Sequence, residues 1–245
     1  MNGNVNALFQ RVALITGEDA LEKFQQTRVL VFGLGGVGSW AAEALARSGI
    51  GKIGVIDFDT IALGNVNRQI QATSRTIGQP KADVMRERLL EINPCCEAAA
   101  WNAVFSRDNA AQFNIKDADY VIDAIDTLNH KLDLIETCGA AGTPLYSSMG
   151  MALRLNPARI KIAGIWDTHG CPLARLVREG LRKRNWTGSF TAVYSDESPS
   201  PRMEKKQAEE GEAGGKIING SMVTVTAAAG MTLASLVLCD IVGRR

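Results

Sequence analysis

The stretch Thr27-Arg-Val-Leu-Val-Phe-Gly-Leu-Gly-Gly-Val-Gly38 joins an apolar, β-rich run directly to a cluster of glycines. Residues 39–48 (SWAAEALARS) are rich in alanine and have helical periodicity, and they end at a glycine, which is typical of a helix stop. A second apolar run, Lys52-Ile-Gly-Val-Ile56, follows and ends at Asp57. This order of strand, tight turn, helix and strand predicts a βαβ unit.

The glycines of this unit have a spacing that favours nucleotide binding. Gly33, Gly35 and Gly38 satisfy the pattern GxGxxG, which lets the backbone approach a phosphate at the positive end of a helix. Asp57 lies 19 residues after Gly38, at a strand end, where a carboxylate can accept hydrogen bonds from ribose hydroxyls. The alternative is that the glycines serve only a tight turn and close helix packing.

The chain continues with alternating elements. We expect helices at 81–92, 107–113 and 128–141, and strands at 98–103, 120–123 and 144–149. This alternation predicts an α/β fold with a Rossmann-like, mostly parallel sheet and helices on both faces.

After residue 149 the pattern changes to that of an antiparallel C-terminal extension. Strands are expected at 152–155 and 159–165, around Asn156-Pro157, and a basic amphipathic helix at 172–184. Residues 196–215 are rich in Ser, Pro, Gly and charge, which predicts a mobile loop. The apolar segment 217–239 contains several Thr, Ser and Asn residues, so we expect a buried or interface helix rather than a membrane span.

Composition is that of a soluble globular protein. The 27 Lys and Arg residues balance 26 Asp and Glu, which removes the argument for wholesale electrostatic binding of nucleic acid. The five cysteines include no CxxC pair and no zinc spacing, so they fit a reducing compartment. Because the N-terminal residues lack the pattern of a signal peptide, we expect a cytoplasmic protein.

Charged and polar residues downstream of the glycines favour nucleotidyl transfer over hydride transfer. Arg68 and Lys81 can neutralise charge that develops on the phosphates, and Asp126 can hold Mg²⁺ through a hard oxygen ligand. Asn65 can orient a phosphate oxygen. Solvated surface charges at Arg68 and Lys81, and a helix-capping role for Asp126, are the alternatives.

Four motifs together resemble the HesA/MoeB/ThiF family, which is related to ubiquitin-activating enzymes. They are GLGGVG at 33–38, DFDTIALGNVNRQ at 57–69, GQPKAD at 78–83 and DAIDT at 123–127, within a match over roughly residues 9–150. The resemblance implies a ubiquitin-activating-enzyme-like adenylation fold in one domain, residues 1–245. Its expected parts are an N-terminal helical segment (6–26), an ATP-binding core (27–150) and a substrate and dimer extension (151–245).

The same resemblance implies the roles of the site residues. ATP is expected to bind at the glycine loop, including Gly36, and at Asp57, Asn65, Arg68 and Lys81, with Mg²⁺ and catalytic work at Asp126. In this family an arginine from the N-terminal helix of a dimer partner reaches the phosphates. Arg11 matches that position and would act in trans within a homodimer, whereas Leu8 stands where a preceding Arg is common.

The later motifs resemble the branch of the family that dehydrates threonylcarbamoyladenosine in tRNA. They are SWAAEALARSGIG, NRQI, EINP, YVIDAID, and Pro172-Leu-Ala followed by a basic helix and Tyr194-Ser-Asp-Glu197. The resemblance implies that ATP activates the threonyl carboxylate at adenosine 37, and that the neighbouring carbamoyl group closes a ring with loss of water. No enzyme thiol is then needed, and Cys171 is expected to be structural.

Other functions stay open. The runner-up is an enzyme that adenylates the Gly-Gly end of a ubiquitin-like sulfur carrier, with a sulfur-transfer protein as partner. Such enzymes usually carry two CxxC pairs, which this chain lacks. A nucleotide-binding scaffold and a nicotinamide dehydrogenase are weaker alternatives.

A tRNA substrate suggests a basic surface. Residues 175–206 contain eight basic and four acidic residues, with Trp186 and Phe190 between them. Phosphate contacts and base stacking are therefore expected here, and a solvated helix face is the alternative. The basic residues are Arg175, Arg178, Arg182, Lys183, Arg184, Arg202, Lys205 and Lys206.

Overall fold

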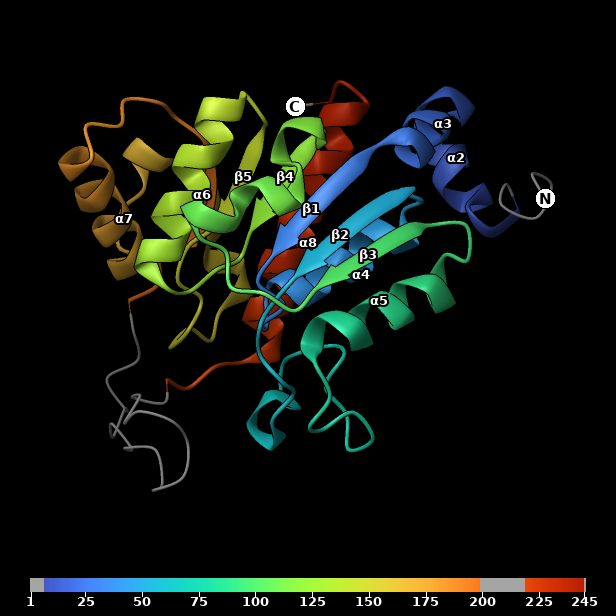
Figure 1. Ribbon diagram of the computed structural model, residues 1–245, viewed down its shortest axis with the longest axis horizontal. Helices are drawn as coiled ribbons and strands as arrows, with labels where there is room; N and C mark the ends of the chain where they lie inside the picture. The colour runs from blue at the N-terminus through green and yellow to red at the C-terminus, as the bar shows by residue number, and fades with distance from the viewer. Residues whose placement is uncertain (1–6, 199–218, 245) are drawn as a thin grey trace.

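The computed structural model describes residues 7–198 and 219–244 (Figure 1). Within these ranges one seven-stranded sheet has the order β3-β2-β1-β4-β5-β7-β6. The strands are β1 (Arg28–Phe32), β2 (Lys52–Ile56), β3 (Glu97–Trp101), β4 (Tyr120–Asp123), β5 (Leu145–Ser148), β6 (Ile160–Gly164) and β7 (Thr191–Ser195). Neighbouring strands from β3 to β7 are parallel, and β6 is antiparallel to β7. The predicted α/β fold with a mostly parallel sheet and an antiparallel C-terminal pair is confirmed.

Each central strand is buried on both faces, which explains its continuous apolar sequence. In β1, Val29 and Val31 contact one core cluster, whereas Leu30 and Phe32 contact a second cluster on the opposite face. The first cluster includes residues of α3 (Glu18–Gln26), α4 (Gly38–Arg47), α5 (Lys81–Ile92) and α8 (Val223–Ile241). The second includes residues of α6 (Leu128–Ala141) and α7 (Pro172–Lys183). The prediction of helices on both faces is thus confirmed.

Within the described residues, the predicted N-terminal helical segment is interrupted at Gly17. α2 (Gln10–Thr16) and α3 meet at Gly17, whose φ of 89° is in the left-handed region that favours glycine. The N–H of Gly51, just before β2, donates to the carbonyl of Phe24 at 2.9 Å, and Phe9 packs beside Gly49. These contacts hold α2 and α3 at the amino ends of β1 and β2 (Figure 1).

The expected strand at 152–155 is wrong, and the antiparallel partner of β6 is β7 instead. Leu153 has a φ of 66°, a left-handed conformation that strand residues do not adopt. The N–H groups of Leu155 and Asn156 donate to the Glu197 carboxylate at 3.1 and 3.0 Å, so they are not available to a strand ladder. The expected helix at 107–113 is a 3₁₀ helix (Arg107–Phe113).

α8 is long and apolar enough to cross a membrane, judged by length and composition alone. Its buried residues, among them Val225, Ala229, Leu233 and Val237, recur at helical spacing and form a stripe against α4 and the sheet. Met231 and Ser235 lie on the opposite, exposed face. This one-sided burial fits the expected buried or interface helix. Of the expected mobile loop at 196–215, residues 199–215 lie outside the described residues.

Candidate functional site

The glycine loop makes a tight turn between β1 and α4. Gly33 has a φ of 87°, and a Cβ atom there would lie 2.7 Å from the Ala124 carbonyl oxygen. At Gly38, the first residue of α4, a Cβ would lie 1.8 Å from the carbonyl oxygen of Gly33. Larger residues are therefore excluded at both positions. A Cβ at Gly35 would meet nothing within 4 Å, so the backbone there is open to a ligand.

Asp57 connects the end of β2 to this loop. Its carboxylate accepts hydrogen bonds from the N–H of Leu34 at 2.6 Å and the N–H of Asp59 at 2.9 Å. The side chain is buried, and this burial raises the pKa of Asp57 above its ordinary value, although nearby Lys81 opposes the rise. The carboxylate is thereby held beside the glycine loop, and its predicted contact with a ribose stays a prediction.

Lys81 is also close to this carboxylate. It is the first residue of α5 and is buried, and its Nζ lies 2.7 Å from Oδ2 of Asp59. Sequence reasoning did not identify Asp59 as the partner of Lys81. The acid two residues after Asp57 in DFD was the available signal.

Arg68 lies against the glycine loop. A Cβ at Gly36 would approach the Cδ of Arg68 within 3.2 Å and the side chain of Thr226, from α8, within 3.1 Å. The guanidinium donates to Gly64 O and Asn67 Oδ1 at 2.8 and 2.9 Å, and it forms no ion pair within the described residues. Burial lowers the pKa of Arg68, but an arginine side chain stays charged in proteins.

Asn65 lies close in sequence to Arg68, at the end of a 3₁₀ turn (Leu63–Asn65). Its Oδ1 accepts the Ala62 N–H at 3.0 Å, and its backbone carbonyl accepts the Arg68 N–H at 3.1 Å. The structure thus assigns Asn65 a part in shaping the loop that carries Arg68. Its predicted contact with a phosphate stays a prediction.

A buried charge network supports the next loop of the site. Asp123 ends β4, and its Oδ2 accepts from Lys131 Nζ at 2.5 Å and from the Ser147 hydroxyl at 2.6 Å. Its other oxygen accepts the Ile125 N–H at 3.0 Å. Lys131 and Ser147 were not identified from the sequence, because a lysine in a helix is usually exposed.

Asp126 follows this network and is exposed. One carboxylate oxygen accepts from the Thr127 hydroxyl at 3.2 Å, and no side-chain bond caps α6, so helix capping does not explain this residue. No group of three metal-ligating side chains occurs among residues 7–198 and 219–244. A single carboxylate with hard oxygen donors fits Mg²⁺, which is usually bound by one or two carboxylates together with substrate phosphates.

Arg11 is far from the other predicted site residues within one chain. It is exposed on α2, which lies at the amino ends of β1 and β2. The glycine loop, Asp57 and Asp126 follow the carboxyl ends of β1, β2 and β4, on the opposite edge of the parallel sheet. A role for Arg11 at this site therefore needs a second chain.

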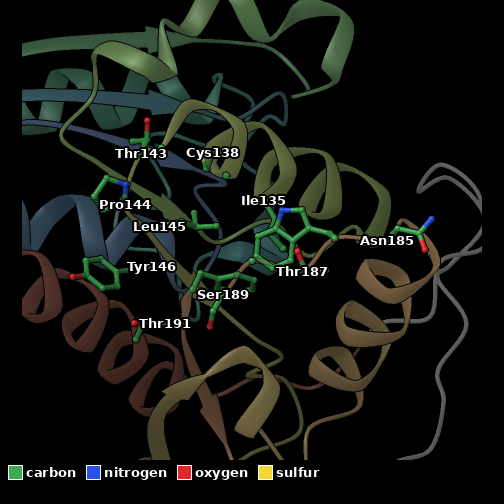
Figure 2. Close-up of a pocket in the computed structure, with 15 residues that line it drawn as sticks. Ile135, Cys138, Thr143, Pro144, Leu145, Tyr146, Asn185, Thr187, Ser189 and Thr191 are labelled. Carbon is green, nitrogen blue, oxygen red and sulfur yellow. The ribbon is translucent and has the colours of Figure 1, made fainter.

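A cavity of about 660 Å³ lies at the amino ends of strands β5 and β7. Figure 2 shows the side chains that line it. Tyr146 and Thr191, near the amino ends of β5 and β7, line it together with Cys138 of α6 and the segment between α7 and β7. Because the nucleotide motifs follow the carboxyl ends of the strands, this cavity is separate from the predicted ATP site.

Only some residues of the predicted basic surface are free to contact a tRNA. Arg175 and Arg184 form ion pairs with acidic residues, and Arg182 lies over the ring of Trp166. Phe190 is buried, so it cannot stack on a base, whereas Trp186 is half-buried. Arg202, Lys205 and Lys206 lie outside the described residues.

Cys171 precedes α7 and is buried beside Gly150, with its Sγ 3.7 Å from the position of a Cβ there. This burial fits the expected structural role.

Known proteins resemble this chain over nearly its whole length. A model of the ThiF family matches residues 8–244. The tRNA threonylcarbamoyladenosine dehydratase of Bacillus subtilis is 41% identical over 238 residues, which cover 95% of this chain and 94% of that protein. A crystal structure of the Escherichia coli tRNA N6-threonylcarbamoyladenosine dehydratase in complex with ATP has a TM-score of 0.86 at 34% identity. The match covers 97% of this chain and 95% of that one.

Similarity to the sulfur-carrier branch is shorter. The molybdopterin-synthase adenylyltransferase of Escherichia coli is 37% identical over 137 residues, which cover 56% of this chain and 54% of that protein. The family model spans both the glycine-loop half and the C-terminal extension, and the dehydratase match does so too. On these grounds the chain belongs to the ThiF family.

Proposed function

We propose that this chain is an ATP-dependent dehydratase that acts on threonylcarbamoyladenosine at position 37 of tRNA. The observation that carries the proposal is the likeness to a dehydratase over 95% of this chain and 94% of the relative, which includes the C-terminal extension. The similarity to a sulfur-carrier activator extends over only about half of each chain.

The described residues fit the binding of ATP. Backbone N–H groups of the glycine loop can hold phosphate oxygens at the start of α4, and the Asp57 carboxylate can accept from ribose. Arg68 and Lys81 place two cations near the phosphate position, where they stabilise the charge that develops during transfer.

The ring closure needs an activated carboxylate, because a free carboxylate oxygen is a poor leaving group. A threonyl carboxylate oxygen attacks the α-phosphorus of ATP, and the bond to the leaving pyrophosphate breaks. The carbamoyl group of the same nucleoside then attacks the acyl carbon and loses a proton, and AMP leaves with the carboxylate oxygen. Because the nucleophile is already part of the substrate, no enzyme thiol is needed, in agreement with the burial of Cys171.

Asp126 is the residue that would hold Mg²⁺ in this site. When bound, the ion neutralises phosphate charge.

We also propose a homodimer in which Arg11 serves the partner's ATP site. This is supported by the location of Arg11 at the opposite edge of the sheet from its own glycine loop. All five cysteines are free, which supports a cytoplasmic location.

The test is a reaction of the purified protein with ATP, Mg²⁺ and tRNA that carries threonylcarbamoyladenosine. We expect the nucleoside to lose one water by mass spectrometry, with AMP and pyrophosphate as nucleotide products. ADP and phosphate would place the attack on the γ-phosphorus instead. If the tRNA is unchanged and a carrier protein ending in Gly-Gly is adenylated, the sulfur-carrier function replaces this one.

A further inference from the structure

Arg154 has a buried side chain with unused hydrogen-bond donors. Only 2% of the residue is exposed. Its Nε and Nη1 atoms are buried without a hydrogen-bond partner, and the guanidinium forms no ion pair within the described residues. A buried charge without a partner is unfavourable, and each such group in a native protein needs an explanation. An anionic ligand would supply the missing acceptors.

The loop that carries Arg154 is held firmly in place. The N–H of Leu153 donates to the Gly220 carbonyl at 2.9 Å, and the N–H groups of Leu155 and Asn156 donate to the Glu197 carboxylate. Leu153 has a φ of 66°, which a branched residue adopts only where its surroundings impose it. Hydrogen bonds therefore hold the backbone on both sides of Arg154.

This loop is also linked to the phosphate side of the site. Gly220, which accepts from Leu153, is followed by Ser221, whose carbonyl accepts from Asn67 Nδ2 at 3.1 Å. Asn67 in turn accepts from Arg68, the cation beside the glycine loop. Two hydrogen-bonded segments therefore connect the Arg154 loop to Arg68.

The strand order places the Arg154 loop relative to the predicted site residues. Along the carboxyl edge of the sheet, Asp57 follows β2, the glycine loop follows β1, and Asp126 follows β4. The Arg154 loop follows β5, the next strand along. In the proposed site the order along the sheet is ribose, phosphates and metal ligand, so we expect the group that attacks the phosphorus beside the loop after β5.

We propose that Arg154 binds the carboxylate of the acid that ATP activates, as a substrate-binding residue. The planar guanidinium presents donors in a fixed fork that matches the two oxygens of a carboxylate. This inference rests on the proposed function, in which that acid is the threonyl group. In that function Arg68 and Lys81 are the residues that hold the phosphates, so we expect a change at Arg154 to leave ATP binding unaffected.

The test compares the parent protein with Arg154→Gln and with Arg154→Lys, which keeps the charge but loses the fork. Titration calorimetry measures the Kd for ATP without tRNA, and steady-state kinetics measures kcat/KM for tRNA that carries threonylcarbamoyladenosine. In R154Q we expect an unchanged Kd and a kcat/KM reduced about 100-fold, with R154K between the two. The matched control is Arg159→Gln, because Arg159 is exposed and pairs with Asp196; it should keep parental kcat/KM.

Thermal unfolding without ligands gives an independent measurement. Removal of a buried cation that lacks a partner should leave the Tm of R154Q equal to or above that of the parent. A lower Tm in both R154Q and R154K, the second of which keeps most of the side-chain packing and the charge, would show that the guanidinium already has a partner within the chain, and would overturn the proposal.

Two kinetic outcomes would also overturn it. Parental kcat/KM in R154Q would remove the role in substrate binding, and an equal loss of ATP affinity would assign Arg154 to a phosphate instead. If the parent protein itself fails to dehydrate the tRNA, the proposed function is wrong and this inference falls with it. A parent that dehydrates the tRNA with an R154Q variant that does so equally well refutes only the role of Arg154.

Discussion

The Nζ atom of Lys131 lies 2.5 Å from Oδ2 of Asp123, and neither side chain is exposed to solvent. The pair joins α6 to the end of β4, directly before the loop that carries Asp126. A buried ion pair is weak evidence for stability in itself, but the loss of one partner leaves a buried charge without compensation. The pair therefore holds the loop after β4 in place. Removal of either side chain should lower the free energy of unfolding.

Lys131→Met should lower the free energy of unfolding by about 3–5 kcal/mol, because Asp123 then stays buried without its cation. Urea denaturation measures this change. The double variant Lys131→Met with Asp123→Asn removes both charges and should lose less than the sum of the two single changes. Additive losses would mean that the two side chains do not interact.

Arg68→Ala should remove about 2.7–4 kcal/mol of transition-state stabilisation, which lowers kcat/KM as much as the loss of an oxyanion donor does. The reason is that Arg68 lies beside the glycine loop without a carboxylate partner in the described residues. Turnover of ATP with modified tRNA is the measurement. Arg75→Ala, an exposed arginine in the next loop, is the control and should keep parental turnover; equal losses in both variants would contradict the assignment.

The raised pKa of Asp57 predicts a dependence of stability on pH. Because burial raises the pKa, the folded state binds the proton more tightly than the unfolded chain. The free energy of unfolding should therefore fall as the pH rises from the ordinary value of 3.8 until it passes the folded-state pKa. Denaturation of the parent and of Asp57→Asn across this range measures the effect. A difference between them that does not change with pH would refute it.

Mixed dimers test the action of Arg11 in trans. Arg11→Ala and Lys81→Ala should each be inactive alone, since each breaks every site of its own homodimer. Random mixing after dissociation should restore about a quarter of parental activity, because half of the dimers are mixed and each of those has one intact site. No recovery in a sample whose subunits have exchanged would mean that Arg11 does not act in trans.

The cysteines should differ sharply in reactivity. Burial raises the pKa of Cys96 to about 11 and also raises that of Cys138, whereas Cys95 is exposed. A thiol reagent at pH 8 should label Cys95 in the native protein and reach the other two only after unfolding, which peptide mass spectrometry can follow.

Cys171→Ser should leave dehydration intact, because the thiol is buried and the proposed ring closure needs no thioester. The measurement is turnover of modified tRNA. Complete loss of activity in a variant with parental Tm would support a thioester route instead.

Local patterns predicted the elements that lie near the glycine loop. The sequence has a continuous apolar or helical pattern at each of β1, α4 and β2. Glycine is required at 33 by the positive φ of the turn and at 38 by the close approach to the Gly33 carbonyl, both of which are local features. β7 was missed because Thr191–Ser195 is a short run without alternation, and its strand character comes from pairing with β5 and β6. Pairing between distant segments leaves little trace in a short sequence window.

The sequence by itself determined the Rossmann-like core and its glycine turn, and it predicted Asp57, Arg68, Lys81 and Asp126 as site residues, since each occurs in a motif with local physical meaning. Only the tertiary structure decided that Asp59 pairs with Lys81, that Arg11 lies at the far edge of the sheet and that Arg154 is buried. Burial and ion pairing depend on which segments meet in space, whereas a single arginine or lysine in the sequence looks like any solvated surface charge.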